Sequence, residues 1–236
     1  MSETLNKIVQ HLELAKSLHQ RVEQHNMTRS LRALQEWQTK RLLTTHQDLW
    51  QSKRFKPAMS FFIDELYGPK DFSKRDSDIA RVVPKMAKLL PQQALDSLES
   101  ALRLNSLSFE LDVKMSEQLE QTPVDRHTYA QAYQRCDNFN QREEQISLLE
   151  SLGEDLAEVV KIPGISALLM LSRKPAKMAG VESLQVFLES GFKAFKKLGN
   201  VEDFIVPIVS RERQMMHALF DAEDLLTMNP LPEVVI

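Results

Sequence analysis

The sequence predicts an all-α protein, a multi-helix bundle of roughly nine or ten helices with an N-terminal helical hairpin. Apolar residues recur every three to four positions along most of the 236 residues, as they do on the buried face of a helix. Only 6 residues are glycine, and helix-forming Leu, Gln, Glu, Lys and Ala are plentiful. No segment shows the strict alternation of a half-buried strand.

The first 50 residues have the pattern of two antiparallel helices. The first helix runs from Ser2-Glu3 to the turn at His25-Asn26, and the second starts at Thr28 and extends to about Leu49. We expect this hairpin, residues 1–50, to pack on the main domain or on a second subunit. The apolar stripe of the first helix consists of Leu5, Ile8, Val9, Leu12, Ala15, Leu18 and Val22.

Residues 51–224 are expected to form the main helical bundle, followed by a loose C-terminal tail at 225–236. One helix begins near Pro57 and stops at Gly68-Pro69. Asn105-Ser106 is expected to interrupt a later helix, and Asp125 in the sequence TPVD to cap the helix that follows.

Charge is distributed unevenly along the chain. Residues 1–57 carry 10 basic and 5 acidic side chains, whereas residues 91–160 carry 5 basic and 14 acidic ones. Two interpretations follow. Either two oppositely charged faces of one domain are solvated or lie close together, or the basic N-terminal segment docks on an acidic partner or another subunit. The overall charge of −3 gives no support for nucleic acid as a partner.

Familiar catalytic and cofactor motifs are absent from the sequence. It has no phosphate-binding Gly-Lys-Ser loop, no G-x-G-x-x-G, no H-E-x-x-H, no G-x-S-x-G and no Glu-x-x-His pair. We therefore predict no cofactor and no metal. A metal site assembled from scattered residues has no support in their spacing and stays open as an alternative; its candidates are Asp64, Glu65, His127, Glu144 and His217.

The cellular setting follows from what the chain contains. A single cysteine, Cys136, suits a reducing compartment. The N-terminus lacks the apolar run of a signal peptide, and no apolar stretch reaches 18 residues. We expect a cytoplasmic protein without a membrane as a partner.

The stretch FFIDELYGPKDFSKRD at residues 61–76 concentrates aromatic and charged residues, and two interpretations apply to it. It forms either a tight helix–turn–helix corner or part of a buried acidic–arginine pocket. Arg-Glu neighbours in two other helices extend the second interpretation, because such pairs form buried ion pairs between helices. The candidate pocket residues are Asp64, Glu65, Tyr67, Asp71, Arg75, Asp76, Arg142, Glu143, Arg211 and Glu212.

Several of these stretches resemble a family of uncharacterised, bacterial, all-helical proteins. The resemblance spans about residues 55–215, and the FF-x-x-ELYGP-x-DF-x-x-RD pattern is its most specific part. The other matching stretches are REEQI at 142–146, KPAKMAG at 174–180, LQVFLESGFKAF at 184–195 and RER at 211–213. The resemblance implies a soluble helical protein and assigns no activity to any residue.

Two hypotheses about function follow. The first is a non-enzymatic interaction or scaffold protein that binds a protein partner or self-associates as a homodimer through the N-terminal hairpin. The second is a helical-bundle enzyme, or a protein that binds a small ligand or metal, in the buried polar pocket. The sequence patterns leave enzymatic activity open.

Overall fold

The computed structural model describes residues 3–67, 73–86, 92–119 and 122–234, which are all-α and contain no strand. The first half of the chain forms α1 (Glu3–Gln24), α2 (Thr28–Thr45), α3 (Gln47–Gln51), α4 (Lys56–Phe62), the π-helical segment η1 (Ile63–Tyr67), α5 (Ser73–Met86) and α6 (Gln92–Leu119). The second half forms α7 (Arg126–Arg135), α8 (Phe139–Val159), α9 (Ile165–Leu171), α10 (Arg173–Met178), α11 (Glu182–Leu198) and α12 (Glu202–Asp221).

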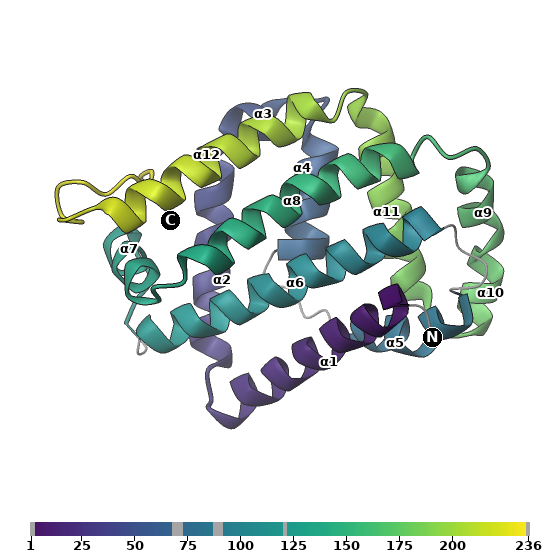
Figure 1. The fold of residues 1–236 in the computed structure, drawn as a ribbon, viewed down its shortest axis with the longest axis horizontal. Coiled ribbons are helices and arrows are strands. Elements are labelled where there is room, and N and C mark those ends of the chain that lie inside the picture. Colours follow the sequence, from purple (N-terminus) through teal and green to yellow (C-terminus); the bar gives the residue numbers. More distant parts are fainter. Residues whose placement is uncertain (1–2, 68–72, 87–91, 120–121, 235–236) are drawn as a thin grey trace.

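The helices form two crossed layers (Figure 1). In the front layer α1, α6, α8 and α12 lie side by side in that order, and each contacts the next. Behind them α2, α4 and α11 run across the front layer at a steep angle. Because α6 is the longest helix and contacts α1, α2, α7, α8 and η1, it is the element on which both layers assemble.

The predicted N-terminal hairpin exists as α1 and α2, joined by a short turn in which Asn26 has a positive φ of 55°, but the two helices lie in different layers and cross at a steep angle instead of running antiparallel side by side. The apolar stripe of α1 packs on α6 of the same chain. Beside the turn, Val22 of α1, Leu31 of α2 and Val113 of α6 form a small apolar cluster. Arg21 of α1 pairs with Glu117 of α6 at 2.5 Å. The basic N-terminal segment thus contacts the acidic central region of its own chain.

Two boundaries differ from the sequence-based expectation. The expected interruption at Asn105-Ser106 does not occur, since α6 continues through both residues. Both are buried, and the Ser106 hydroxyl donates to the Arg103 carbonyl, so packing on two sides outweighs the weak helix propensity of these polar residues. In contrast, the second predicted helix is divided at His46, whose backbone (φ −114°, ψ 36°) leaves the helical region.

The expectation of a loose C-terminal tail is also wrong for the described residues. Leu231 is only 2% exposed, and Arg126 donates to the backbone carbonyls of Leu231 and Asn229. The Asn229 side chain donates in return to the Arg126 carbonyl. This segment is therefore held on the N-terminal end of α7, where Asp125 forms the predicted cap by accepting from the backbone of His127 and Thr128.

The aromatic part of the 61–76 stretch lies in the core. Phe61 and Phe62 pack against Phe195 of α11 with ring centroids 6.3 and 5.9 Å apart, and Phe62 also stacks on Phe204 of α12 at 5.9 Å. Gly191 of α11 lies against the Phe61 ring. A Cβ at this position would lie 2.9 Å from that ring, so the glycine lets α11 approach α4 closely. The consecutive phenylalanines therefore join α4 to α11 and α12.

Candidate functional site

The acidic residues of the 61–76 stretch do not share one environment. Asp64 is exposed on η1, Glu65 is half-buried, and Asp76 is buried on α5. Asp71 and the side chains of Tyr67 and Arg75 lie outside the described residues. The π-helical turn places Asp64 toward solvent, so it does not line a buried pocket.

Two other predicted residues form ion pairs on or near the surface. Arg211 makes two hydrogen bonds to Asp48 at 2.7 and 2.9 Å, and both side chains are at least 37% exposed. Glu143 accepts from Arg213 at 2.8 Å. These two contacts connect α12 to α3 and to α8, respectively, and we regard them as structural.

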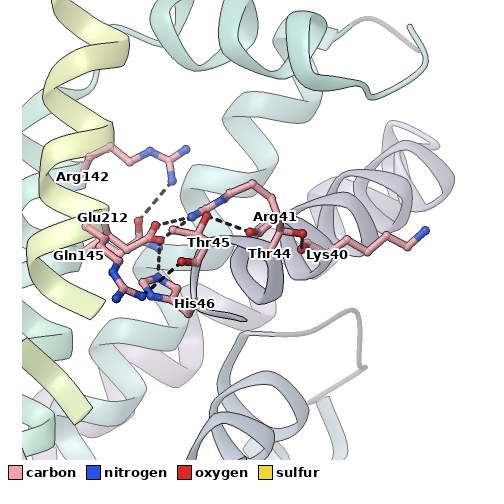
Figure 2. A network of polar contacts seen from close by, with 9 residues as sticks. Lys40, Arg41, Thr44, Thr45, His46, Arg142, Gln145 and Glu212 are labelled. Atoms are coloured by element: carbon pink, nitrogen blue, oxygen red, sulfur yellow. Dashed lines mark hydrogen bonds and ion pairs between the residues drawn. The ribbon is translucent and has the colours of Figure 1, made fainter. Parts of the chain in front are cut away.

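The remaining predicted residues, Glu212 and Arg142, lie in a buried polar cluster (Figure 2). Arg41 donates through Nη1 to both carboxylate oxygens of Glu212 at 2.6 Å, and His46 Nε2 lies 2.9 Å from Glu212 Oε1. The His46 side chain is fully buried, Arg41 keeps 6% of its side-chain exposure and Glu212 keeps 16%. We call Arg41, His46 and Glu212 the ion-pair cluster.

Local structure explains how one short segment supplies two partners of Glu212. Arg41 lies on the buried face of α2, one turn after Trp37. The chain leaves the helix at His46, and this break between α2 and α3 places the ring against Glu212 of α12, 166 residues away. The break in the helix at His46 therefore allows both Arg41 and His46 to contact Glu212.

The electrostatics of the cluster favour the ionised carboxylate. Burial alone would raise the pKa of Glu212, but the charge of Arg41 and the hydrogen bonds from His46 and Arg41 outweigh it and lower the pKa to about 2. Glu212 is therefore an ionised acceptor at neutral pH, and its proton affinity is too low for a general base.

Arg142 lies beside this cluster. It donates to Gln145 Oε1 at 3.3 Å, and its guanidinium lies 4.5 Å from the ring centre of Tyr133. Gln145 in turn donates to Ser108 Oγ at 2.7 Å. Burial raises the pKa of Tyr133, despite the opposing charge of Arg142, so the phenol stays neutral. The hydrogen bonds with Arg142 and Ser108 fix the side chain of Gln145, which lies on α8, against α6.

Another buried carboxylate, Asp112 on α6, was missed by the sequence analysis. It accepts from the side-chain amides of Gln35 and Gln38, both at 3.0 Å. Burial raises the pKa of Asp112, although these two hydrogen bonds and the charge of Arg142 act in the opposite direction. Both amide donors lie on α2, so we interpret the Asp112 carboxylate as a link between α2 and α6.

A cavity of about 90 Å³ lies between the two helical layers, next to the ion-pair cluster. Helices α2 and α4 contribute its walls on one side, and α6, α8 and α12 on the other. Most of its wall is apolar, and the polar groups come from His46, Ser108, Gln145 and Glu212. The apolar wall consists of Leu42, Met59, Phe62, Leu104, Ile146, Leu149 and Ile208.

A more open surface pocket of about 560 Å³ between α8 and α12 is lined by Glu150, Arg213 and His217, but Arg213 there is already paired with Glu143 and Glu150. Burial raises the pKa of the Cys136 thiol, so it is protonated and weakly nucleophilic at neutral pH. Within the described residues, no three His, Cys, Asp or Glu side chains gather closely enough to hold a metal ion. The cavity and the ion-pair cluster are therefore the candidate site.

The sequence analysis found Glu212 and Arg142 because an Arg-Glu neighbour stood out in an apolar helix, but it missed Arg41 and His46. A signal for Arg41 was present: it continues the buried face marked by Leu34 and Trp37 at helical spacing. No comparable sequence signal marks His46, because its role depends on the break after α2.

Comparisons with known proteins identify a family and assign no activity. No curated protein and no solved structure matches the chain. Among the helices of the described residues, none has the length and apolar character needed to cross a membrane. A family model described as a domain of unknown function, DUF8198, matches residues 17–225. This match covers most of the sequence, and the chain belongs to the DUF8198 family.

Proposed function

We propose that this protein binds a small, mostly apolar molecule in the cavity between its two helical layers. The observation that carries the proposal is the composition of the cavity wall, in which a few fixed polar groups converge on an otherwise apolar space beside a residue of strongly shifted pKa. Sites for small ligands in helical bundles have this character.

The polar groups of the wall are held in place by neighbouring side chains. Gln145 is held by Arg142 and Ser108, and His46 by Glu212. A ligand that enters therefore meets preformed hydrogen-bonding groups and does not have to order them, which lowers the cost of binding. These contacts support binding and positioning rather than attack on a substrate.

Filling the cavity is expected to abolish binding. Leu149→Phe adds a ring in the cavity wall, whereas Leu148→Phe enlarges the neighbouring leucine of α8, which is not part of that wall. We expect n-butanol or methyl propyl ether to bind the wild type, and Leu149→Phe to weaken this binding roughly tenfold or more by steric exclusion. Isothermal titration calorimetry measures both affinities.

The Leu148→Phe variant controls for the change in hydrophobicity and should bind as the wild type does. If neither compound binds the wild type at concentrations up to its solubility, the proposal is wrong. Equal binding by Leu149→Phe and Leu148→Phe would place the ligand outside this cavity and would also overturn the proposal.

A second candidate function, a role in protein interaction, is favoured by the corner formed by α9 and α10 at one edge of the molecule (Figure 1). We call residues 161–180 the α9–α10 corner. It contains four basic residues and no acidic residue. Its exposed apolar side chains are Leu168, Met170, Leu171 and Met178, exposed by 39, 61, 76 and 90%. Clustered exposed apolar residues mark contact surfaces, and the charge favours an acidic partner.

This interaction hypothesis has a matched pair of test variants. Leu171 in the corner and Leu226 near the C-terminus are each 76% exposed. Leu171→Glu is expected to release a bound protein partner, and Leu226→Glu to retain it, when complexes are isolated from the source cells by an affinity tag and compared. A complex that survives both changes would exclude the corner as its contact surface.

A further inference from the structure

The α9–α10 corner carries apolar side chains that project away from the rest of the protein. Leu171 is 76% exposed and Met178 is 90% exposed. Of residues 161–180, all of which the structure describes, Ile165 alone is buried. A side chain that lines a groove is covered by the walls of that groove, so exposure this high indicates a projecting surface. The corner therefore suits entry into a hollow on a partner, and not reception of a partner's helix.

Polar contacts hold the corner on the body of the protein. Arg173 makes two hydrogen bonds to the Glu189 carboxylate of α11, each 2.6 Å long. Gln185 of α11 donates to the Leu169 carbonyl at 2.7 Å and accepts from the Ser172 hydroxyl at 3.0 Å. Because these contacts fix both short helices on α11, the projecting side chains form a preformed surface, which lowers the cost of binding.

Two of the four basic residues in the corner are exposed and loosely paired or unpaired in the list of ion pairs. Lys174 is exposed, and Lys177 keeps 79% of its side-chain exposure while its Nζ lies 3.9 Å from Glu182. The other two, Arg173 and Lys161, pair with acidic residues of the same chain at 2.6 Å. The apolar side chains of the corner are therefore accompanied by positive charge that a partner can reach.

The pocket between α8 and α12 offers a hollow with an apolar part. Its volume is about 560 Å³, and it has room for several side chains, since an engineered apolar cavity of about 150 Å³ holds benzene. Val206 in its wall is 55% exposed, and Val209 beside it is buried. We call it the α8–α12 pocket, and it is lined by Glu150, Val206, Val209, Ser210, Arg213, Gln214 and His217.

Acidic side chains surround the arginine of this pocket. Arg213 is shared between Glu143 at 2.8 Å and Glu150 at 3.4 Å, so these three residues together carry a charge of −1. Glu154 follows Glu150 by one helical turn of α8, and Glu202 lies one turn before the pocket residues of α12; both are exposed. This negative charge complements the two exposed lysines of the corner.

The corner and the pocket lie on different parts of the molecule. Figure 1 shows the corner at one edge, whereas α8 and α12 belong to the front layer. A contact between corner and pocket therefore joins two copies of the chain. Two corners that face each other would bring lysines together, and two facing pockets would bring carboxylates together. Charge thus favours pairing of a corner with a pocket.

We propose that copies of this chain associate head to tail, with the α9–α10 corner of one copy inserted in the α8–α12 pocket of the next. Leu171 then packs against Val206, and the exposed lysines of the corner face the acidic residues around the pocket. This inference rests on the interaction hypothesis above, since it names a second copy of the chain as the partner. Each dimer keeps a free corner and a free pocket, so association continues until a ring closes.

Sedimentation velocity of the wild type is the first test. The mean mass should rise above that of one chain as the protein concentration rises, and should fall when salt is added, because salt screens exposed charges. Leu171→Glu and Val206→Glu should each weaken the association at least about tenfold, since each places a charge in the apolar contact. Leu226→Glu, at a residue as exposed as Leu171, is the control and should associate as the wild type does.

Mixing the two defective variants gives the sharpest test of a head-to-tail contact. Leu171→Glu keeps an intact pocket, and Val206→Glu keeps an intact corner. Each variant alone should be monomeric, whereas an equimolar mixture should form a dimer with one copy of each. This dimer should not grow further, because its remaining corner and pocket are the altered ones. Circular dichroism checks that both variants, which change exposed residues, keep the helical fold.

The outcomes separate this inference from the interaction hypothesis. A wild type that stays monomeric up to its solubility limit overturns self-association, and the hypothesis of another protein partner still stands if Leu171→Glu releases a complex isolated from cells. Association that survives both single changes places the contact elsewhere and overturns the inference. A mixture that stays monomeric overturns it too, because a corner would then not bind a pocket. If a variant does not fold, the concentration and salt dependence of the wild type still decides whether copies associate through charge.

Discussion

Replacing Glu212 by glutamine is expected to lower the free energy of unfolding by about 3–5 kcal/mol. The substitution keeps the size of the side chain but removes the charge that balances Arg41, which has only 6% of its side chain exposed. It also replaces one carboxylate oxygen with an amide group that cannot accept from Arg41. The loss of stability is measured by urea denaturation of the wild type and the variant.

The neighbouring residue on α12 provides the control. Arg211→Gln breaks the ion pair with Asp48, in which the side chains are 37 and 56% exposed, and should cost less than about 1 kcal/mol. Exchanging Arg41 and Glu212 together for methionine should restore much of the stability lost in Glu212→Gln, because no unbalanced charge remains. If Glu212→Gln is as stable as Arg211→Gln, the ion-pair cluster does not contribute as described.

The same carboxylate predicts the pH dependence of this effect. The pKa of Glu212 falls from an ordinary value of 4.5 to about 2 on folding. Its contribution to stability, about 3 kcal/mol, is therefore fully present above pH 4.5 and is lost as the pH falls toward about 2. The difference in unfolding free energy between the wild type and Glu212→Gln should shrink over this range.

Truncation of Phe195 to alanine is expected to cost about 3–5 kcal/mol of unfolding free energy. Phe195 is 1% exposed on α11 and meets both Phe61 and Phe62 edge to face. Removing its ring leaves a space where α4 and α11 pack, and the neighbouring rings can close it only in part. Chemical denaturation monitored by circular dichroism measures the effect.

A half-buried phenylalanine on the same helix, Phe192, is the matched control. Its ring is covered by Lys196, whose Nζ lies 5.4 Å from the ring centre, and Phe192→Ala should cost less than half as much as Phe195→Ala. Equal losses for the two variants would mean that the aromatic cluster is not the main contact between α4 and α11.

The helical class and most of the helices could be predicted because apolar periodicity is a local property of the sequence. The stripe of α1 and the cap at Asp125 are examples, since each depends on residues within a few turns of one another. The continuity of α6 through Asn105-Ser106 could not be predicted in this way. It depends on helices that pack on both sides and override the local preference of these residues.

The candidate site was predictable only in part for the same reason. Glu212 stood out beside Arg211, but its partner Arg41 is 171 positions away, and a charge pair at that distance leaves no periodic pattern. Asp64 is the opposite case: it lies in the most conspicuous stretch of the sequence and points to solvent. Local density of charged residues did not distinguish a buried group from an exposed one.

The break between α2 and α3 limits where residues can be inserted in members of this family. Arg41 near the end of α2 and His46 directly after that helix both reach one carboxylate, so the number of residues between them is set by geometry. One inserted residue would rotate Arg41 by about 100° relative to His46 and turn one of them away from α12. Family members that retain the ion-pair cluster should therefore tolerate insertions between α8 and α9 but none between positions 41 and 46.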